Sequence, residues 1–351
     1  MKTTIFTGPQ QLEIRDVAAP VLEPAQVLVK THAVGLCTLE QRLFKGAPAD
    51  SYPFLGGHEV AGEVVEVGPL AATAARPGDI VSLALLTRCG TCYYCRRGMD
   101  NLCIRNNESR ARGQLPGPAG LSEYVAAEDY QVYPTSLPAG SAADRASRIA
   151  ELALAEPLAC VIRSVQAPPQ QFGDLALVQG AGIMGLLHVQ LLRQRGVRVV
   201  MAEPDAHRRE LALQAGADWA IDPLADDLSA FLRARSGGYG VNAVFFTAGG
   251  APAIQQALHG MAKGAWLCLY GSVHPQGPVQ IDPNLIHYNE WVLTGSFSHT
   301  SASFQQAVAM ISSRKVDLAP YVSERVPFPD VYRGLQRALS PATYRVVMTF
   351  D

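Results

Sequence analysis

Short apolar runs rich in β-branched residues recur through the first 140 residues, and glycine or proline brackets each of them. The clearest runs are residues 27–31, 60–67 and 79–83. Runs of this length between turn-forming residues are typical of strands. Helices and strands do not alternate regularly in this part of the chain. We therefore predict an all-β, barrel-like domain.

The pattern changes after about residue 145. Apolar positions recur at helical spacing from Arg148 to Val165, and Pro157 interrupts them, so we predict a kink there. Apolar strands then alternate with helical stretches, which indicates an α/β domain with a doubly wound parallel sheet. The strands predicted for this sheet are residues 175–178, 197–202, 243–246 and 266–270.

Two domains are thus expected, which suits a chain of 351 residues. The strand-rich domain comprises residues 1–157 and, because short strand-like pieces and one helix at 303–312 return near the end, residues 297–351. The sheet domain, residues 158–296, is inserted between these two parts.

Composition excludes several classes of protein. Hydrophobic residues make up 48% of the chain and charged residues 17%, which is globular rather than disordered composition. A net charge of −2 without a long basic block argues against a nucleic-acid partner. No apolar run approaches the roughly 20 residues of a membrane span, and the first residues lack a signal core. We expect a cytoplasmic protein.

A glycine-rich turn follows the first predicted strand of the sheet domain directly and opens a helix. It reads Gly180-Ala181-Gly182-Ile183-Met184-Gly185. In this context the first glycine permits the tight turn, the second lets the backbone approach a diphosphate, and the third allows close packing of helix and strand. The diphosphate would lie at the helix N-terminus. A strand–helix turn without a ligand is the alternative interpretation.

A carboxylate at the end of the next strand, Glu203, indicates which dinucleotide binds. A carboxylate at this place accepts hydrogen bonds from the adenosine ribose and repels a 2′-phosphate. NAD is therefore favoured over NADP, although Arg208 and Arg209 follow closely and would suit a phosphate.

Four of the seven cysteines lie within fifteen residues, as Cys89-x-x-Cys92-x-x-Cys95-x7-Cys103. Such spacing lets four sulfurs converge on one tetrahedral zinc ion and leaves no vertex for substrate, so this lobe, residues 89–103, is predicted to hold a structural zinc. Three arginines offset its negative charge: Arg88, Arg96 and Arg97. An iron–sulfur cluster or a redox-active cysteine pair is the alternative interpretation.

An open metal site is a second possibility, because a thiolate, an imidazole and a carboxylate can supply three ligands and leave the fourth position for an alcohol oxygen. The candidates are Cys37, His58, the adjacent Glu59, and Glu156. Taken singly, each has an ordinary structural interpretation, and spacing alone does not assemble them.

These motifs together resemble the zinc-containing medium-chain dehydrogenase/reductase family over nearly the whole chain. The resemblance rests on Val34-Gly35-Leu36-Cys37, Gly57-His58-Glu59, the cysteine lobe, Glu156-Pro157-Leu158-Ala159-Cys160 and the turn from Gly180 to Gly185. It implies a GroES-like β-rich catalytic domain interrupted by a Rossmann domain. Glu156 in place of a cysteine, and Tyr344-Arg345-Val346-Val347 near the end, are similar to the polyol, sugar and threonine dehydrogenase branch.

The resemblance also implies the roles of the metal-site residues. Cys37, His58 and Glu156 would hold a catalytic zinc, so two zinc ions per chain are expected, and Glu59 would orient the site or exchange onto the metal. Glu40 would support His58. Leu39 stands where the family often has a hydroxyl that starts a proton relay, so Thr38, a water chain or Glu59 would have to replace it.

The implied function is a hydride transfer between NAD(H) and a secondary alcohol or ketone of a small polyhydroxylated molecule. A reductase of an activated C=C bond is one alternative, and a non-catalytic NAD-binding protein is another. The resemblance implies a homodimer or homotetramer. Four polar residues could line the substrate pocket, although surface or packing roles are favoured for each: Arg112, His287, Tyr288 and His299.

Overall fold

The computed structural model describes residues 1–46, 52–106, 115–135, 137, 141–273 and 276–350. It divides into two compact units. Unit 1 comprises Met1–Ala159 and His299–Asp351, and unit 2 comprises Cys160–Ser298. The boundaries proposed from the sequence differ from this division by two residues at each crossing. Each unit is described by itself below.

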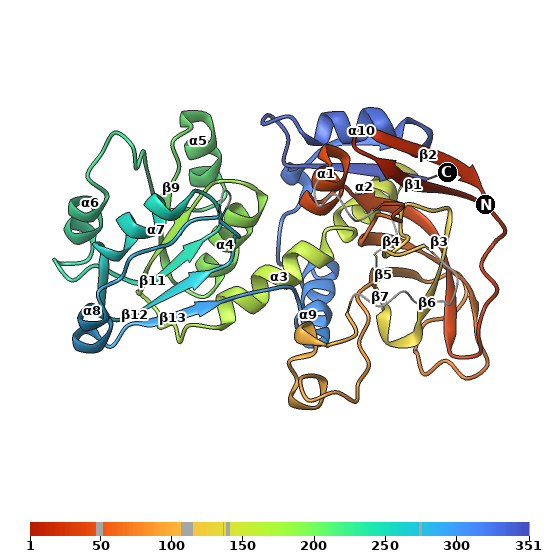
Figure 1. Ribbon diagram of the computed structural model, residues 1–351, viewed down its shortest axis with the longest axis horizontal. Coiled ribbons are helices and arrows are strands. Elements are labelled where there is room, and N and C mark those ends of the chain that lie inside the picture. The colour runs from red at the N-terminus through yellow and green to blue at the C-terminus, as the bar shows by residue number, and fades with distance from the viewer. Residues whose placement is uncertain (47–51, 107–114, 136, 138–140, 274–275, 351) are drawn as a thin grey trace. The chain divides into compact units, whose positions relative to one another are not determined.

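A mixed sheet of seven strands forms the centre of unit 1 among the described residues (Figure 1). Its order is β14-β15-β3-β4-β5-β7, and β6 pairs with β3. The strands are β3 (Gln26–Gly35), β4 (Glu59–Val67), β5 (Ile80–Ala84), β6 (Tyr124–Glu128), β7 (Val132–Pro134), β14 (Val322–Pro327) and β15 (Arg345–Thr349). Strand β15 pairs antiparallel with β3, and Val347 lies opposite Gly35. The part of β3 that leads to Cys37 is therefore paired with a strand from near the C-terminus.

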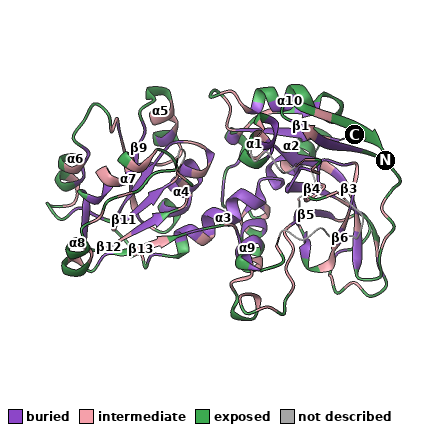
Figure 2. Cartoon of the chain, in the orientation of Figure 1, coloured by how far each residue is buried: buried purple, intermediate pink, exposed green. Residues whose placement is uncertain are grey.

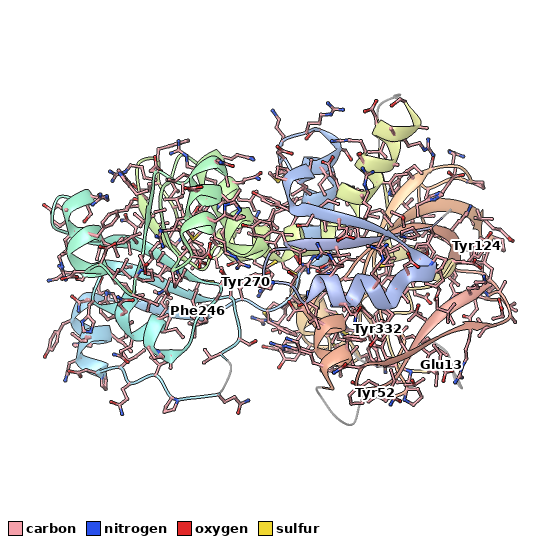
Figure 3. The ribbon with its side chains drawn as sticks, turned by 90° about the horizontal axis from the view of Figure 1, so that it is seen from above. Glu13, Tyr52, Tyr124, Phe246, Tyr270 and Tyr332 are labelled. Atoms are coloured by element: carbon pink, nitrogen blue, oxygen red, sulfur yellow. The ribbon has the colours of Figure 1, made fainter. Side chains whose placement is uncertain are left out.

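Helices and a hairpin surround this sheet. The hairpin is β1 (Lys2–Gly8) with β2 (Gln11–Asp16); the helices are α1 (Thr38–Lys45), α2 (Ala142–Leu152), α9 (Ser301–Ser312) and α10 (Val331–Ala338). Short 3-10 turns are η1 (Cys95–Arg97), η2 (Asp100–Leu102), η3 (Asp129–Gln131), η4 (Ala319–Tyr321) and η5 (Phe328–Asp330). Tyr332 of α10 meets Phe44 of α1 edge to face, with ring centroids 5.3 Å apart (Figure 3). Over the described ranges, no helix is long and apolar enough to span a membrane.

Helix α1 corrects the expectation that this part of the chain is all β. It has only eight residues, and its buried apolar residues, Leu43 and Phe44, are adjacent in sequence, so no helical period is visible; capping at both ends adds to the packing of these two residues. The Cys37 backbone N–H donates to the Glu40 side chain at 3.0 Å, and Gly46 ends the helix in the left-handed region with φ 96°. The remaining prediction, a strand-rich unit, is confirmed.

Apolar side chains between the sheet and α1, α10 and β1 form the core of unit 1, and Phe6, Val34, Leu83, Leu121 and Leu335 are among its fully buried members. Strand β3 is buried at every second position through its middle and at both ends, and the first half of β4 is buried on both faces. Figure 2 shows the central strands of the sheet buried and the outer faces of the helices exposed.

Unit 2 contains a parallel sheet of order β10-β9-β8-β11-β12-β13 within the described chain. Its strands are β8 (Leu175–Gln179), β9 (Arg198–Ala202), β10 (Trp219–Ile221), β11 (Val241–Phe246), β12 (Met261–Leu269) and β13 (Val292–Gly295). The chain moves outward from β8 in one direction and then returns to β11 on the other side. The carboxyl ends of β8 and β11 are therefore the switch point at which doubly wound sheets bind ligands.

Helices connect these strands: α4 (Ile183–Gln194), α5 (Ala206–Gln214), α6 (Leu228–Arg235), α7 (Ala251–Leu258) and α8 (Pro283–Asn289). Right-handed crossovers place α4 and α5 on one face of the sheet and α6 and α7 on the other (Figure 1). At the carboxyl end of the sheet the Tyr270 backbone N–H donates to Phe246 O at 3.1 Å, so these two residues lie side by side (Figure 3). The predicted doubly wound fold is confirmed.

The predicted kink at Pro157 is wrong. The helical stretch breaks earlier, at Ala153 and Leu154, and a new helix, α3 (Ala155–Gln166), begins there. Pro157 lies in the first turn of α3, where a missing N–H removes no intrahelical hydrogen bond. The proline therefore helps to start a helix and leaves Glu156 at its beginning.

Candidate metal and dinucleotide sites

The ends of two paired strands bring the first candidate ligands together. Cys37 follows β3, His58 precedes β4, and the strand register sets Gly35 opposite Glu59. A Cβ added to Gly35 would lie 2.0 Å from Glu59 Oε2, so only glycine leaves space for this carboxylate. Gly35, two residues before Cys37, is thus needed for the geometry of the site.

Glu40 of α1 fixes the orientation of His58. Its Oε1 accepts a hydrogen bond from the Gly57 backbone N–H at 2.9 Å and lies 3.1 Å from His58 Nδ1. A carboxylate at Nδ1 favours the tautomer that leaves the Nε2 lone pair available to a metal. Burial lowers the pKa of His58, but the charges of Glu40 and Cys37 outweigh it and raise this pKa well above its ordinary value. The expected supporting role of Glu40 fits this geometry.

Glu59 is fully buried and faces the guanidinium of Arg345, with 3.0 Å between Oε1 and Nη2. The contact is an ion pair without hydrogen-bond geometry, and neither oxygen of Glu59 has a hydrogen-bond partner among the described residues. Burial raises the pKa of Glu59 to about 7, although the Arg345 charge opposes the rise. A buried carboxylate of this kind requires further positive charge.

Cys37, His58 and Glu59 form one cluster whose ligand atoms all lie within 4.8 Å of one another. A thiol, an imidazole and a carboxylate with two oxygens lacking donors suit Zn²⁺ in an open site. Thr38, one of the proposed replacements for the relay hydroxyl, is exposed on α1, and Leu39, which stands in the place of that hydroxyl, is 36% exposed.

Glu156, the third ligand implied by the family resemblance, lies outside this 4.8 Å cluster but close to it. Its charge raises the pKa of Glu59, although by less than burial does. Glu156 Oε1 lies 3.9 Å from His299 Nε2, and both side chains are buried. Burial lowers the pKa of His299 to about 4, so this imidazole is neutral at pH 7. One turn further along α3, Cys160 is also buried.

The cysteine lobe gathers its four sulfurs as expected. The sulfurs of Cys89, Cys92, Cys95 and Cys103 lie within 4.8 Å of one another, and two of them, from Cys89 and Cys95, are 4.0 Å apart. Four thiolates on one tetrahedral zinc are about 3.8 Å apart, because each Zn–S bond is roughly 2.3 Å. Backbone N–H groups of Cys89 and Cys92 donate to sulfurs of the same set, each at 3.3 Å.

The acidities of these thiols are consistent with a cation site. Hydrogen bonds from Thr91, the backbone one first, lower the pKa of Cys89 to about 6. Burial and the neighbouring thiols raise the pKa of Cys95 to about 12. Four sulfurs this close cannot all lose their protons unless a cation compensates their charge.

The glycine-rich turn of unit 2 has the geometry predicted for a dinucleotide site. Gly180 has φ 94°, which favours glycine, and a Cβ on Gly185 would lie 1.8 Å from Gly180 O. A Cβ on Gly182 would meet nothing within 4 Å, so the backbone is open where a diphosphate would approach. Ile183 and Met184 begin α4 directly after Gly182.

Glu203 joins this turn to the next strand. Its Oε2 accepts from the Ala181 N–H at 2.8 Å and its Oε1 from the Asp205 N–H at 3.0 Å. Arg209 donates to Glu203 O at 2.8 Å and lies 3.4 Å from an Asp222 oxygen, so this arginine is held by the protein itself. Arg208 is half-buried on α5.

Two of the four suggested pocket residues lie on the surface of α8, where the rings of His287 and Tyr288 contact each other at 4.8 Å. Arg112 lies outside the described residues. Sequence reasoning did not assign a role to Arg345, or to Thr247, whose hydroxyl donates to Gln179 O at 2.7 Å beside the glycine turn. The one local signal for Thr247 is its place in a turn-forming sequence directly after a strand, Thr247-Ala248-Gly249-Gly250.

A strand-rich unit that collects a thiol, an imidazole and carboxylates, and a doubly wound unit with a dinucleotide turn, together define a metal-dependent dehydrogenase. The comparisons identify the family. Residues 23–138 match the alcohol dehydrogenase GroES-like domain, and residues 184–313 match the zinc-binding dehydrogenase domain. The chain belongs to the zinc-binding alcohol dehydrogenase family and is a zinc-binding, nicotinamide-dependent oxidoreductase.

Relatives support this membership over the full length. The L-threonine 3-dehydrogenase of Pyrococcus abyssi is 32% identical over 95% of this chain and 92% of its own. The sorbitol dehydrogenase of Halalkalibacterium halodurans is 27% identical over 99% of both chains. The crystal structure of a zinc-binding dehydrogenase from Sinorhizobium meliloti 1021 bound to NADP matches with TM-score 0.86 and 26% identity, over 99% of each chain.

Proposed function

We propose that this enzyme oxidises a secondary alcohol of a small polyhydroxylated molecule with NAD, and reduces the corresponding ketone in reverse. The observation that carries the proposal is the cluster of Cys37, His58 and Glu59, in which a buried carboxylate lacks donors among the described residues. An acidic, imidazole- and thiol-containing cluster of this kind suits a catalytic metal better than a purely structural one.

Cys37, His58 and Glu156 would hold the catalytic zinc, and Glu59 would be the carboxylate that exchanges with Glu156 on it. The cysteine lobe would hold the second, structural zinc. Glu156 begins α3 next to the cluster, whereas Arg345 already pairs with Glu59. A carboxylate that has its own cation is the less available ligand, which favours Glu156 in the resting state.

When bound, the zinc supplies a Lewis acid that lowers the pKa of the substrate hydroxyl, and the nicotinamide accepts the hydride. The protein's own part is to position these groups. Glu40 holds His58 in one tautomer, and Arg345 favours the charged form of Glu59 and orients it. Because Leu39 has no hydroxyl, we assign Glu59 to hold the substrate proton, with Thr38 or a water chain as the alternatives.

NAD is proposed as the cofactor because of Glu203. Two backbone N–H groups orient its carboxylate at the end of β9, beside the glycine turn. A carboxylate here repels the 2′-phosphate of NADP. The Sinorhizobium protein of similar fold was crystallised with NADP, so the ratio of kcat/KM for the two dinucleotides is the direct measurement.

The substrate class rests on the relatives. Named activities among them include L-threonine, sorbitol and D-arabitol-phosphate dehydrogenases, whose names describe hydroxylated substrates. A homodimer or homotetramer is proposed as well, because the resemblance of the sequence to the family implies it. Four thiols at metal-binding spacing suit a reducing compartment, so we place the enzyme in the cytoplasm.

The test combines NADH formation across polyols, sugars, amino alcohols and simple alcohols with metal analysis of the same sample. Two zinc ions per chain and turnover on one hydroxylated class support the proposal. Two zinc ions without any oxidation would favour reduction of an activated C=C bond, and one zinc ion would favour a non-catalytic protein. Replacing Cys37 by Ser should abolish turnover while NAD binding, measured by fluorescence titration, is retained. Full activity in that variant would contradict the ligand assignment.

A further inference from the structure

The cysteine lobe contacts the segment that begins α9, and this segment contacts Glu156. Arg88, directly before Cys89, donates through Nη2 to His299 O at 2.7 Å, and its Nε lies 3.5 Å from Asp100 Oδ2. Asp100 lies between Cys95 and Cys103. Its Oδ2 accepts the backbone N–H of Ser301 at 3.0 Å and also the Ser301 hydroxyl.

Aromatic packing holds the same segment from a second side. The ring of Phe304 contacts those of Tyr133, at a centroid distance of 4.6 Å, and His299, at 5.0 Å. Thr300 caps α9 by accepting the Ser303 N–H at 3.2 Å. Residues 299–301 are therefore fixed by the lobe, by the cap of α9 and by Phe304, with little freedom to rotate.

The fixed segment presents one buried polar atom to the candidate metal site. His299 is 1% exposed, and its Nε2 has no hydrogen-bond partner among the described residues. Glu156 Oε1 lies 3.9 Å from that atom. Nδ1 lies 3.4 Å from Thr300 O, a long contact, and the tautomer with the proton on Nε2 gives it up. In that tautomer a small rotation of the Glu156 side chain would allow Nε2–H to donate to one oxygen and leave the other for a metal. Groups that hydrogen-bond a ligating carboxylate set its orientation and the affinity for the metal.

We propose that Arg88 and Asp100 of the cysteine lobe, acting through His299, are positioning residues for the catalytic metal site. This inference rests on the proposed function, because it takes Glu156 as a ligand of the catalytic zinc. The lobe then does more than stabilise the fold. A metal in the lobe holds Arg88 and Asp100 in place, and they hold His299 against Glu156.

The experiment measures how fast zinc leaves the catalytic site when a chromogenic chelator is added in excess. The Cys37→Ser variant, which should keep only lobe zinc, identifies the two phases of release. His299→Phe retains a ring against Phe304 but removes Nε2, and Asp100→Ala removes the clamp on Ser301. Arg97→Ala is the control, because this exposed lobe residue contacts Tyr93, with 5.1 Å from guanidinium carbon to ring centroid.

We expect His299→Phe and Asp100→Ala each to release catalytic zinc at least tenfold faster than the unsubstituted enzyme. The double variant should be no faster than the faster single one, because both act through one contact. Arg97→Ala should be unchanged. Wild-type release in His299→Phe, multiplied effects in the double variant, or an equal effect of Arg97→Ala would each overturn the inference. If Asp100→Ala also loses the lobe zinc, His299→Phe alone decides.

The same measurement separates this inference from the proposed function. An unsubstituted enzyme that binds one zinc ion per chain contradicts the proposed function. An enzyme that binds two, with unchanged release in His299→Phe, contradicts only the link from the lobe to Glu156. The visible spectrum of the cobalt-loaded enzyme provides a readout independent of activity: His299→Phe should change the bands of the catalytic site and not those of the tetrathiolate.

Discussion

A buried histidine in unit 2 should make the stability of that unit depend on pH. His188 of α4 is completely buried; its Nδ1 lies 2.7 Å from Met184 O, and its Nε2 lies 2.9 Å from the Ser164 hydroxyl. Because a carbonyl oxygen only accepts, Nδ1 carries the proton, and Nε2 accepts from Ser164. The imidazole is thus satisfied in its neutral form, and burial lowers its pKa from 6.5 to about 4.

The sign and size of the effect follow from that shift. A histidine whose pKa is lower in the folded than in the unfolded state contributes its full stability above pH 6.5 and loses it as the pH falls towards 4. Between pH 7 and pH 5 the two pKa values imply a loss of about 2 kcal/mol, and the limit at lower pH is about 3 kcal/mol. His188→Gln cannot take up this proton, so the variant should lack this part of the loss.

The tryptophans make the assay specific for unit 2. The chain has three, Trp219, Trp266 and Trp291, and all of them lie within Cys160–Ser298. Urea unfolding followed by their fluorescence at pH 7 and pH 5 therefore reports on this unit. His207→Gln is the matched control, because His207 is exposed on α5. If His188→Gln loses as much unfolding free energy between the two pH values as the unsubstituted protein does, the assignment of the buried neutral imidazole is refuted.

Three further substitutions test the construction of the sites. Glu40→Gln weakens the hold on His58 and should reduce zinc affinity at the catalytic site by about 10–100-fold, measured by chelator competition; unchanged affinity would contradict the role of this carboxylate. Arg345→Met leaves Glu59 buried without its cation and should lower the unfolding free energy of metal-free unit 1 at pH 8 by about 3–5 kcal/mol, read by circular dichroism; a change below about 1 kcal/mol would refute a structural ion pair. Gly185→Ala places a Cβ 1.8 Å from a backbone oxygen of the turn and should abolish NAD binding in calorimetry, whereas binding at normal affinity would show that the turn relaxes easily.

Features that lie within one short segment were predictable from the sequence. The glycine turn from Gly180 to Gly185 and the four cysteines of the lobe need only local spacing to define their geometry, and the structure has that geometry. The doubly wound sheet was predictable as well, because strands buried on both faces are continuous apolar runs.

Features that join distant segments could not be predicted from the sequence. The pair of Glu59 and Arg345 depends on β15 lying beside β3, which no local pattern records. His299 could be named as a polar residue, but its burial beside Glu156 depends on where α9 begins. Helix α1 was missed because it is only eight residues long and its two core residues, Leu43 and Phe44, are adjacent in sequence, so no period is visible.

The order of strands in unit 1 also constrains how the chain folds during synthesis. Strand β3 is made before unit 2, yet its partner β15 is made after all of unit 2. At typical rates of translation, the roughly 190 residues between Ala159 and Thr349 take about 10–40 s to make. For that time the segment Ala33–Gly35 of β3 lacks its partner strand, and Arg345 is not yet present to pair with Glu59. Unit 2, which is continuous in sequence, can fold in the interval, whereas unit 1, which contains both clusters of candidate metal ligands, cannot complete its sheet until β15 is made.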